Sequence, residues 1–266
     1  MQGSVSGWGS PPMAFFKRIL QEPADVAGRA IVRKERRDVR RLAIDPEFPL
    51  KAVLSFDRHG GTVAPMGNPQ GWDWPGRLIN CSEVGARIRL GPAALAVRGD
   101  FCELRLSLEG FELSLPTRIT NVRVERDGVY FGLKHGLDDE ATRSAHRQLF
   151  EVVALGATLR PQARKSKPDD SGYLVEPYAG DDSRLTVWRE PSDRKVAAFE
   201  FLLKDCLVRA ARGRAVEYRS GSDAANASQA TPAMAEEIRR LFGWVLTNLA
   251  PAVPVDVRDF LRQSAA

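Results

Sequence analysis

The feature that most constrains the fold of this chain is an alternation of apolar and polar residues between Leu50 and Leu133. The pattern is β in short segments separated by turn residues, and in most of them every second residue is apolar: 51–56, 77–80, 86–90, 102–108, 111–115, 118–124 and 129–133. Alternation of this kind, with a turn about every 8–12 residues, is typical of an antiparallel sandwich or barrel. We therefore predict a mainly β fold with about six strands, enough to close a small antiparallel barrel.

A helix and a second unit are predicted after these strands. Residues 138–153 have the pattern of a helix flanking the barrel, with acidic residues at its N-terminus. The polar, proline-containing stretch 160–171 then marks a domain boundary. We divide the chain into an N-terminal extension (1–30), a barrel domain (31–158), a linker (159–172) and a smaller C-terminal α+β domain (173–266).

The C-terminal domain has strand and helix signals, and one segment that stays ambiguous. Residues 185–188 and 215–218 have strand character, and residues 220–232 are expected to form a flexible loop. Segment 196–211 fits either a helix or a β-hairpin, with the hairpin slightly favoured. A helix beginning at Thr231 or Pro232 places apolar residues at helical spacing, and residues 255–263 form a last short helix.

Cysteine usage and hydropathy favour a cytoplasmic protein. Cys81, Cys102 and Cys206 are an odd number of widely spaced residues, which argues against a disulfide framework. No apolar run approaches the ~18–20 residues that span a bilayer, and the polar first residues do not resemble a signal peptide. Residues 13–20 form a short amphipathic helix that either packs on the protein itself or contacts a membrane surface or partner.

Motifs that would indicate catalysis or metal binding are missing from the sequence. His59, His135 and His146 do not lie at metal-ligand spacing from each other or from a cysteine, and we expect His59 and His146 to face solvent. The sequence also lacks the common phosphate-loop and nucleophile-elbow patterns. We expect no catalytic residue, no metal and no cofactor, and therefore a protein that is not an enzyme.

The positive charge of the chain is concentrated in one short segment. The formal net charge is +5, from 39 Lys and Arg against 34 Asp and Glu. Residues 31–41 read IVRKERRDVRR, with six basic and two acidic residues, a balance of +4. Such a segment binds an anion, or it is a solvated charged stretch or a nucleic-acid-binding arm.

Two local sequences decide between these interpretations. Arg37–Arg41 has an RxxxR spacing and follows Arg36, while the pair Arg36 and Arg40 has the same spacing. Asn80–Gly85 reads NCSEVG, an NxSxxG pattern. The two motifs, in this order on either side of a first strand, resemble the PilZ domain, whose ligand is cyclic di-GMP. The resemblance covers about residues 31–155 and implies a six-stranded PilZ-type barrel with a flanking helix; the connection 57–76 is longer than usual for this family.

The resemblance implies a ligand site made of arginines and small polar residues. Guanidinium groups pair with phosphate oxygens in a bidentate manner and match the O6 and N7 edge of guanine. Asparagine and serine oxygens accept from the Watson–Crick edge of guanine, and a glycine lets the backbone turn beside the ligand. Trp72 and Trp74 either cover the barrel or stack on a base. The expected ligand-binding residues are Arg36, Arg37, Arg40, Arg41, Asn80, Ser82 and Gly85.

The expected function is therefore that of a receptor. Cyclic di-GMP would order the mobile segment 31–41 on the barrel and signal to an unidentified protein partner, through the C-terminal domain, in motility, attachment or exopolysaccharide control. One alternative is a scaffold or assembly protein of PilZ fold that acts independently of the nucleotide. A second alternative is a basic nucleic-acid-binding protein. This alternative is weaker because the basic run lacks the interleaved aromatic residues on which bases would stack. Homo-oligomer formation stays open.

Overall fold

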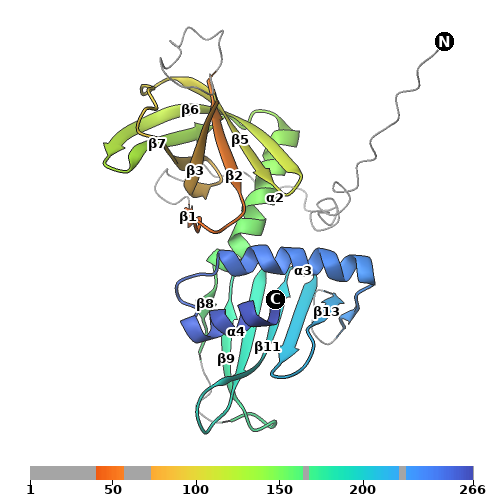
Figure 1. The fold of residues 1–266 in the computed structure, drawn as a ribbon. Helices are drawn as coiled ribbons and strands as arrows, with labels where there is room; N and C mark the ends of the chain where they lie inside the picture. Colours follow the sequence, from red (N-terminus) through yellow and green to blue (C-terminus); the bar gives the residue numbers. More distant parts are fainter. Residues whose placement is uncertain (1–39, 57–72, 164–167, 222–225, 266) are drawn as a thin grey trace, which may run out of the picture.

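The computed structural model describes residues 40–56, 73–163, 168–221 and 226–265, which form two stacked units (Figure 1). The N-terminal unit contains seven strands: β1 (Leu42–Ala43), β2 (Lys51–Ser55), β3 (Asp73–Ser82), β4 (Gly85–Leu90), β5 (Phe101–Leu108), β6 (Phe111–Glu125) and β7 (Gly128–His135). Six of them follow the order β3-β2-β5-β6-β7-β4, and β3 pairs with β4 to close the barrel. The predicted six-stranded antiparallel barrel is confirmed, with β1 as one additional outer strand on β3.

The alternation in the sequence separates the barrel core from its surface. Leu104, Leu106 and Leu108 of β5 are buried, and the residues between them are exposed or half-buried. Strand β3 departs from strict alternation because its register shifts between Leu78 and Asn80, so Leu78 and Cys81 both point inward. A bulge of this kind inserts one extra residue into a strand and disrupts the ladder locally.

Helix α2 (Glu140–Ala157) connects the barrel to the second unit. The side chain of Asp139 caps it by accepting from the backbone N–H of Thr142 at 2.7 Å. The expectation that His146 faces solvent was wrong: the residue is buried, and its ring centroid lies 4.8 Å from that of His135 on β7. Helical spacing explains the difference, since His146 shares a face with Leu149, which packs on the barrel.

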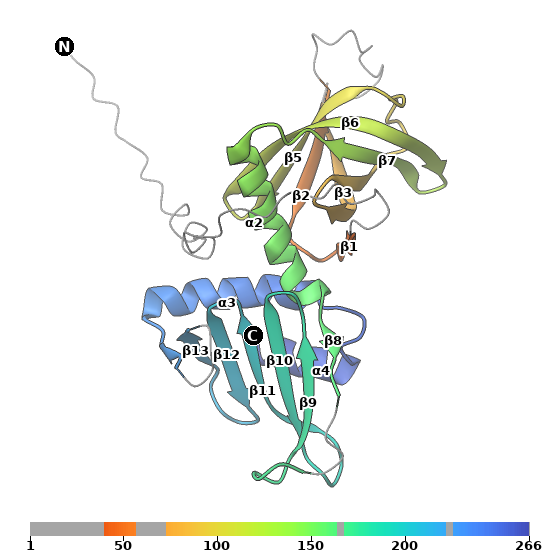
Figure 2. The same cartoon turned by 180° about the vertical axis from the view of Figure 1, so that it is seen from behind.

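The second unit is an antiparallel sheet with helices on one face. Its strands are β8 (Arg160–Pro161), β9 (Leu174–Ala179), β10 (Ser183–Arg189), β11 (Val196–Leu203), β12 (Cys206–Ala211), β13 (Glu217–Ser220) and β14 (Ser228–Gln229), paired in sequence order. The ambiguous segment 196–211 is the β11–β12 hairpin. Helices α3 (Pro232–Thr247) and α4 (Val255–Ala265) lie on one face, and Figure 2 shows the opposite face.

Two segments expected as irregular contribute short strands to this sheet. Arg160 and Pro161 lie within the stretch 159–172 that we expected to be a linker, yet they pair with Ala179 and Tyr178 of β9. Strand β14 lies within the expected loop 220–232 and pairs with β13. The second sheet therefore begins almost directly after α2 ends.

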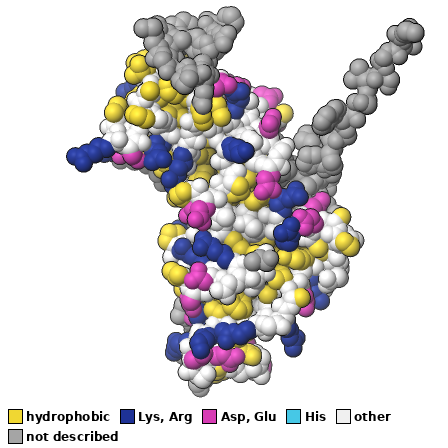
Figure 3. Space-filling view, in the orientation of Figure 1, with side chains coloured by type: hydrophobic (Ala, Val, Ile, Leu, Met, Phe, Trp, Pro, Cys, Tyr) yellow, Lys and Arg dark blue, Asp and Glu magenta, His cyan; other side chains and the backbone are white. Residues whose placement is uncertain are grey.

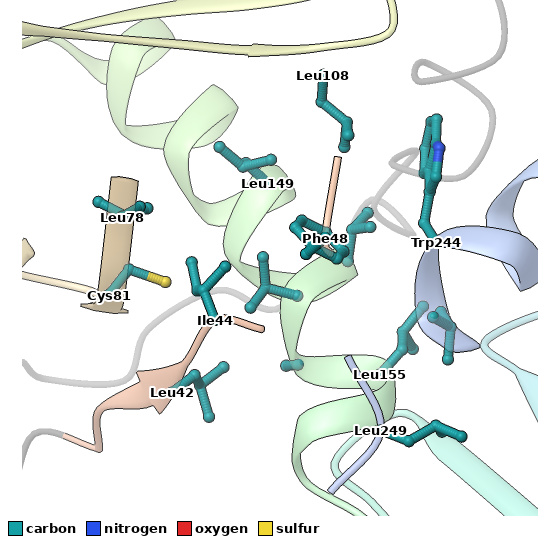
Figure 4. Packing of buried hydrophobic residues seen from close by; sticks show 14 of the residues in the cluster. Leu42, Ile44, Phe48, Leu78, Cys81, Leu108, Leu149, Leu155, Trp244 and Leu249 are labelled. Carbon is teal, nitrogen blue, oxygen red and sulfur yellow. The ribbon is translucent and has the colours of Figure 1, made fainter. Parts of the chain in front are cut away.

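The two units share one buried core at α2. Figure 4 shows side chains of the β1 segment, the barrel, α2 and α3 in a single cluster. Gly156 lies where α2 approaches α3: a Cβ atom at this position would lie 2.8 Å from the carbonyl oxygen of Val245. The buried Asn248 accepts from the backbone N–H of Asp45 at 2.9 Å and donates to the carbonyl oxygen of Val153 at 3.2 Å. These contacts fix the β1 segment, α2 and α3 against one another.

The cysteines are buried, and the described helices are not suited to cross a membrane. Cys81, Cys102 and Cys206 are buried, and burial raises the pKa of the Cys81 thiol to about 12. A thiol with such a pKa is unreactive at neutral pH. Among the described residues, the helices lack the length and apolar character needed to cross a bilayer.

Candidate functional site

The described chain begins within the basic segment, two residues before β1. Arg40 and Arg41 are exposed and lead directly into Leu42 and Ala43. Arg36 and Arg37, the other two arginines of the predicted site, lie outside the described residues, as do the amphipathic segment 13–20 and Trp72. Buried Leu42 and Ile44 anchor the segment that follows the arginines.

Strand β1 brings the end of the arginine motif to the NxSxxG motif. Leu42 pairs with Cys81, and Ala43 pairs with Asn80, in antiparallel register. The same register, continued by one residue, places Arg41 opposite Ser82. A third backbone contact, from Ile44 N–H to the carbonyl oxygen of Ile79 at 3.0 Å, continues the pairing. The described end of the first motif, which leads into β1, therefore lies beside the second motif on β3, about 40 residues later in the sequence.

Each residue of the second motif has a distinct environment. Asn80 is half-buried on β3, between Ala43 of β1 and Arg87 of β4. Cys81 points into the core, as the alternation predicts. Ser82 is also buried, and its hydroxyl donates to the carbonyl oxygen of Gly85 at 3.0 Å, so it stabilises the β3–β4 turn. The ligand contacts predicted for Asn80 and Ser82 stay predictions.

Gly85 has a structural reason to be glycine that sequence reasoning did not identify. We expected it to let the backbone turn beside a ligand. A Cβ atom at this position would lie 2.3 Å from the carbonyl oxygen of Leu133, because Gly85 pairs with Lys134 of β7. The residue therefore permits the close approach of β4 and β7 that completes the barrel.

Arg87 is a candidate site residue that the sequence analysis missed. It is the cross-strand partner of Asn80, and its guanidinium carbon lies 4.6 Å from the ring centroid of Tyr130. Glu125 lies 3.4 Å from the same side chain. Only the register of β3 and β4 shows that Arg87 lies opposite Asn80. In the sequence, Arg87 cannot be distinguished from the other outward-facing residues of an alternating strand.

Trp74 has a packing role rather than a ligand-stacking one. Its side chain is buried in the barrel core. The expectation that this residue either covers the barrel or stacks on a base is thereby resolved in favour of the barrel.

A cavity of about 390 Å³ lies beside the arginines, at the junction of the two units. It is lined by residues 40–46, by Ala157 and Arg160, and by residues 248–251. Arg40 crosses this junction: its Nη1 lies 2.7 Å from Oδ1 and 2.8 Å from Oδ2 of Asp181 in the β9–β10 turn. The described part of the arginine motif therefore borders a space large enough for a small molecule.

Away from this junction, charges of opposite sign are mixed. Figure 3 shows Lys and Arg side chains interspersed with Asp and Glu on the face it presents. Arg89 pairs with Asp127 at 2.8 Å, for example, and Asp127 also accepts from the hydroxyl of Tyr130 at 2.9 Å. These two contacts lower the pKa of Asp127, so the pair stays charged at neutral pH. A mixed surface offers little attraction to a long polyanion.

One comparison with known families matches the N-terminal unit. The family model of the PilZ domain matches residues 33–151. The crystal structure of the PilZ domain of CeSA from a cellulose synthesizing bacterium is 19% identical, with 42% of this chain and 95% of that chain covered and a TM-score of 0.30. A search of curated proteins gave no match. PilZ domains are generally cyclic di-GMP receptors and are binding domains rather than catalytic ones. The residues that the PilZ family model matches, 33–151, include the closed barrel and most of its flanking helix α2.

Proposed function

We propose that this chain is a non-catalytic receptor that binds cyclic di-GMP, changes conformation and passes the signal to a protein partner. One observation carries the proposal: β1 joins the arginine motif to Asn80 and Cys81 of the second motif. The arginines proposed to donate to phosphate and guanine then lead into a strand that pairs with the residues proposed to accept from the guanine edge. The proposed ligand-binding residues are Arg36, Arg37, Arg40, Arg41, Asn80, Ser82 and Gly85, with no metal or cofactor involved.

The chemistry of the ligand explains why arginines would be needed. Cyclic di-GMP carries two phosphates, and each guanidinium can donate two parallel hydrogen bonds to phosphate oxygens. A dianion also offsets repulsion among the basic residues of segment 31–41. Binding would therefore reposition the residues before β1 relative to the barrel. The second unit, which shares a core with the barrel, supplies the surface for a partner.

Titration calorimetry with cyclic di-GMP tests the receptor function. Arg37→Ala and Arg41→Ala should each weaken binding by about tenfold or more, because each removes a charge-assisted contact. Arg126→Ala is the matched control, since Arg126 is exposed at the β6–β7 turn of the same barrel. Binding that survives both substitutions would refute the site, and a flat titration of the unaltered chain would favour the scaffold function.

A salt series separates this proposal from nucleic-acid binding. Binding to generic DNA should be weak and should fall steeply with salt if it reflects only the basic segment. Preference for the dinucleotide over DNA at 150 mM salt supports the receptor, and equal affinity for the two would overturn it. Pull-downs with and without cyclic di-GMP then identify the partner.

A further inference from the structure

We propose that Arg160, which lies outside both motifs, contributes to the binding of cyclic di-GMP, so that the ligand is held between the barrel and the second unit. This inference rests on the proposed function and extends its site. The observation behind it is the cavity at the junction, whose lining includes Arg40 and Arg41 from the segment before β1 and Arg160 from β8 of the second unit.

Arg160 belongs to the second sheet rather than to the barrel. It pairs with Ala179 of β9, and the backbone N–H of Gln162 donates to the carbonyl oxygen of Pro177 at 2.8 Å. Arg40 and Arg41 precede β1, which pairs only with β3. A molecule that contacts all three arginines therefore contacts both units.

The three guanidinium groups differ in what they already bind. Arg40 pairs with Asp181, whereas Arg41 and Arg160 form no ion pair with a carboxylate within the described residues. Nη1 of Arg160 donates to the carbonyl oxygen of the preceding residue, Leu159, at 3.0 Å, which leaves other N–H groups of its fork for an anion. Two exposed cations lining one cavity make a favourable environment for phosphate oxygens.

Residues 248–250 of the lining are fixed by hydrogen bonds. Asn248 is held by Asp45 and Val153, and the backbone N–H of Ala250 donates to the carbonyl oxygen of Gly156 at 3.0 Å. The carbonyl oxygen of Ala250 already accepts from the backbone N–H of Val253 and from Nη2 of Arg258, each at 3.0 Å. The cavity therefore presents cationic donors on a rigid frame, which suits the phosphates of the ligand.

Titration calorimetry on the full chain tests the role of Arg160. Arg160→Gln should weaken cyclic di-GMP binding about 10–100-fold, the range for a lost hydrogen bond to a charged group. Arg160→Lys keeps the charge but loses the planar fork, so it should recover only part of the affinity. Arg214→Gln, an exposed arginine of the same unit, controls for the change of net charge. Thermal unfolding of each variant confirms that the fold is retained.

The outcomes distinguish this inference from the proposed function. If the unaltered chain binds and Arg41→Ala abolishes binding, but Arg160→Gln binds within twofold of the unaltered chain, the composite site is wrong and the receptor function stands. If Arg160→Gln and Arg214→Gln weaken binding equally, the loss comes from the change of net charge, and the inference is wrong. A flat titration of the unaltered chain overturns both.

Discussion

Arg40 and Asp181 form an ion pair across 141 residues of sequence, with Nη1 of the arginine 2.7 Å and 2.8 Å from the two carboxylate oxygens. The pair joins a residue of the predicted ligand site to a turn of the second sheet. The carboxylate offsets the charge of the Arg40 guanidinium, so it would weaken the attraction of Arg40 for a phosphate group. In the proposed complex, ligand occupancy and the contact between the units are therefore linked through one guanidinium.

Replacing Asp181 should increase ligand affinity. Asp181→Asn removes the competing charge, and because the pair is about half exposed its contribution is at most about 1 kcal/mol, equivalent to roughly a fivefold change in Kd. Calorimetry with cyclic di-GMP measures it. Asp182→Asn, the neighbouring residue, makes the same change of net charge. Equal gains in the two variants would show that the ion pair is irrelevant.

Removing Arg189 should strongly destabilise the second unit. The guanidinium is buried, its Nε lies 2.9 Å from Oε2 of buried Glu176, and it also pairs with Asp256 of α4. Arg189→Met leaves a buried carboxylate without its cation and should cost about 3–5 kcal/mol in urea unfolding. Adding Glu176→Gln should recover part of this loss. Arg184→Met, on the exposed face of β10, should change stability by less than about 0.5 kcal/mol.

Stability should fall in mild acid because of the histidine pair. Burial, together with the nearby charge of His146, lowers the pKa of His135 from 6.5 to about 3. The unfolded chain takes up a proton near pH 6.5, while the folded chain does not until about pH 3, so stability is lost as pH falls between these values. Urea unfolding at pH 7.5 and 5 should show a loss of about 2 kcal/mol from this group.

Two histidine variants check this assignment. His135→Gln should reduce the difference between the two pH values, whereas His59→Gln should leave it unchanged. A pH dependence that persists in His135→Gln would mean that other groups cause it.

A side chain at Gly85 should destabilise the barrel. Gly85→Ala forces a methyl group against the carbonyl oxygen of Leu133 and should cost about 1–3 kcal/mol. Gly91→Ala is the matched control, because a Cβ atom there has no neighbour within 4 Å. Comparing the thermal unfolding of the two variants measures the effect. Equal stability would contradict the packing argument, and weaker ligand binding by Gly85→Ala alone would not prove a ligand contact.

The sequence predicted the barrel well because its signal is local. The alternation through residues 102–108 requires one buried face, and β5 has it. The amphipathic helix of the C-terminal domain begins at Pro232, as predicted, because helical spacing depends only on near neighbours. The structure adds that Thr231 caps it.

Features that depend on long-range pairing could not be predicted in the same way. In the sequence Arg160 looks like a linker residue, because a strand of two residues is too short to show any periodicity. Its place in the second sheet is shown only by its pairing with Ala179. In the sequence His146 looks like a polar surface residue, and only the packing of that face of α2 on the barrel shows that it is buried. Arg87 becomes a neighbour of Asn80 only through the register of β3 and β4.

Helix α2 has a practical consequence for any attempt to divide this protein. Leu149 packs toward the barrel, Leu155 packs toward the second unit, and Gly156 lies against α3 (Figure 4). A fragment that ends at residue 158 would expose the apolar surface of α2 that α3 normally covers. A fragment that starts at residue 158 would lack α2, so the apolar surface of α3 that packs on it would be exposed. The smallest piece that keeps its own interior therefore extends from the β1 segment through α4, so the two units should be produced together as a single fragment.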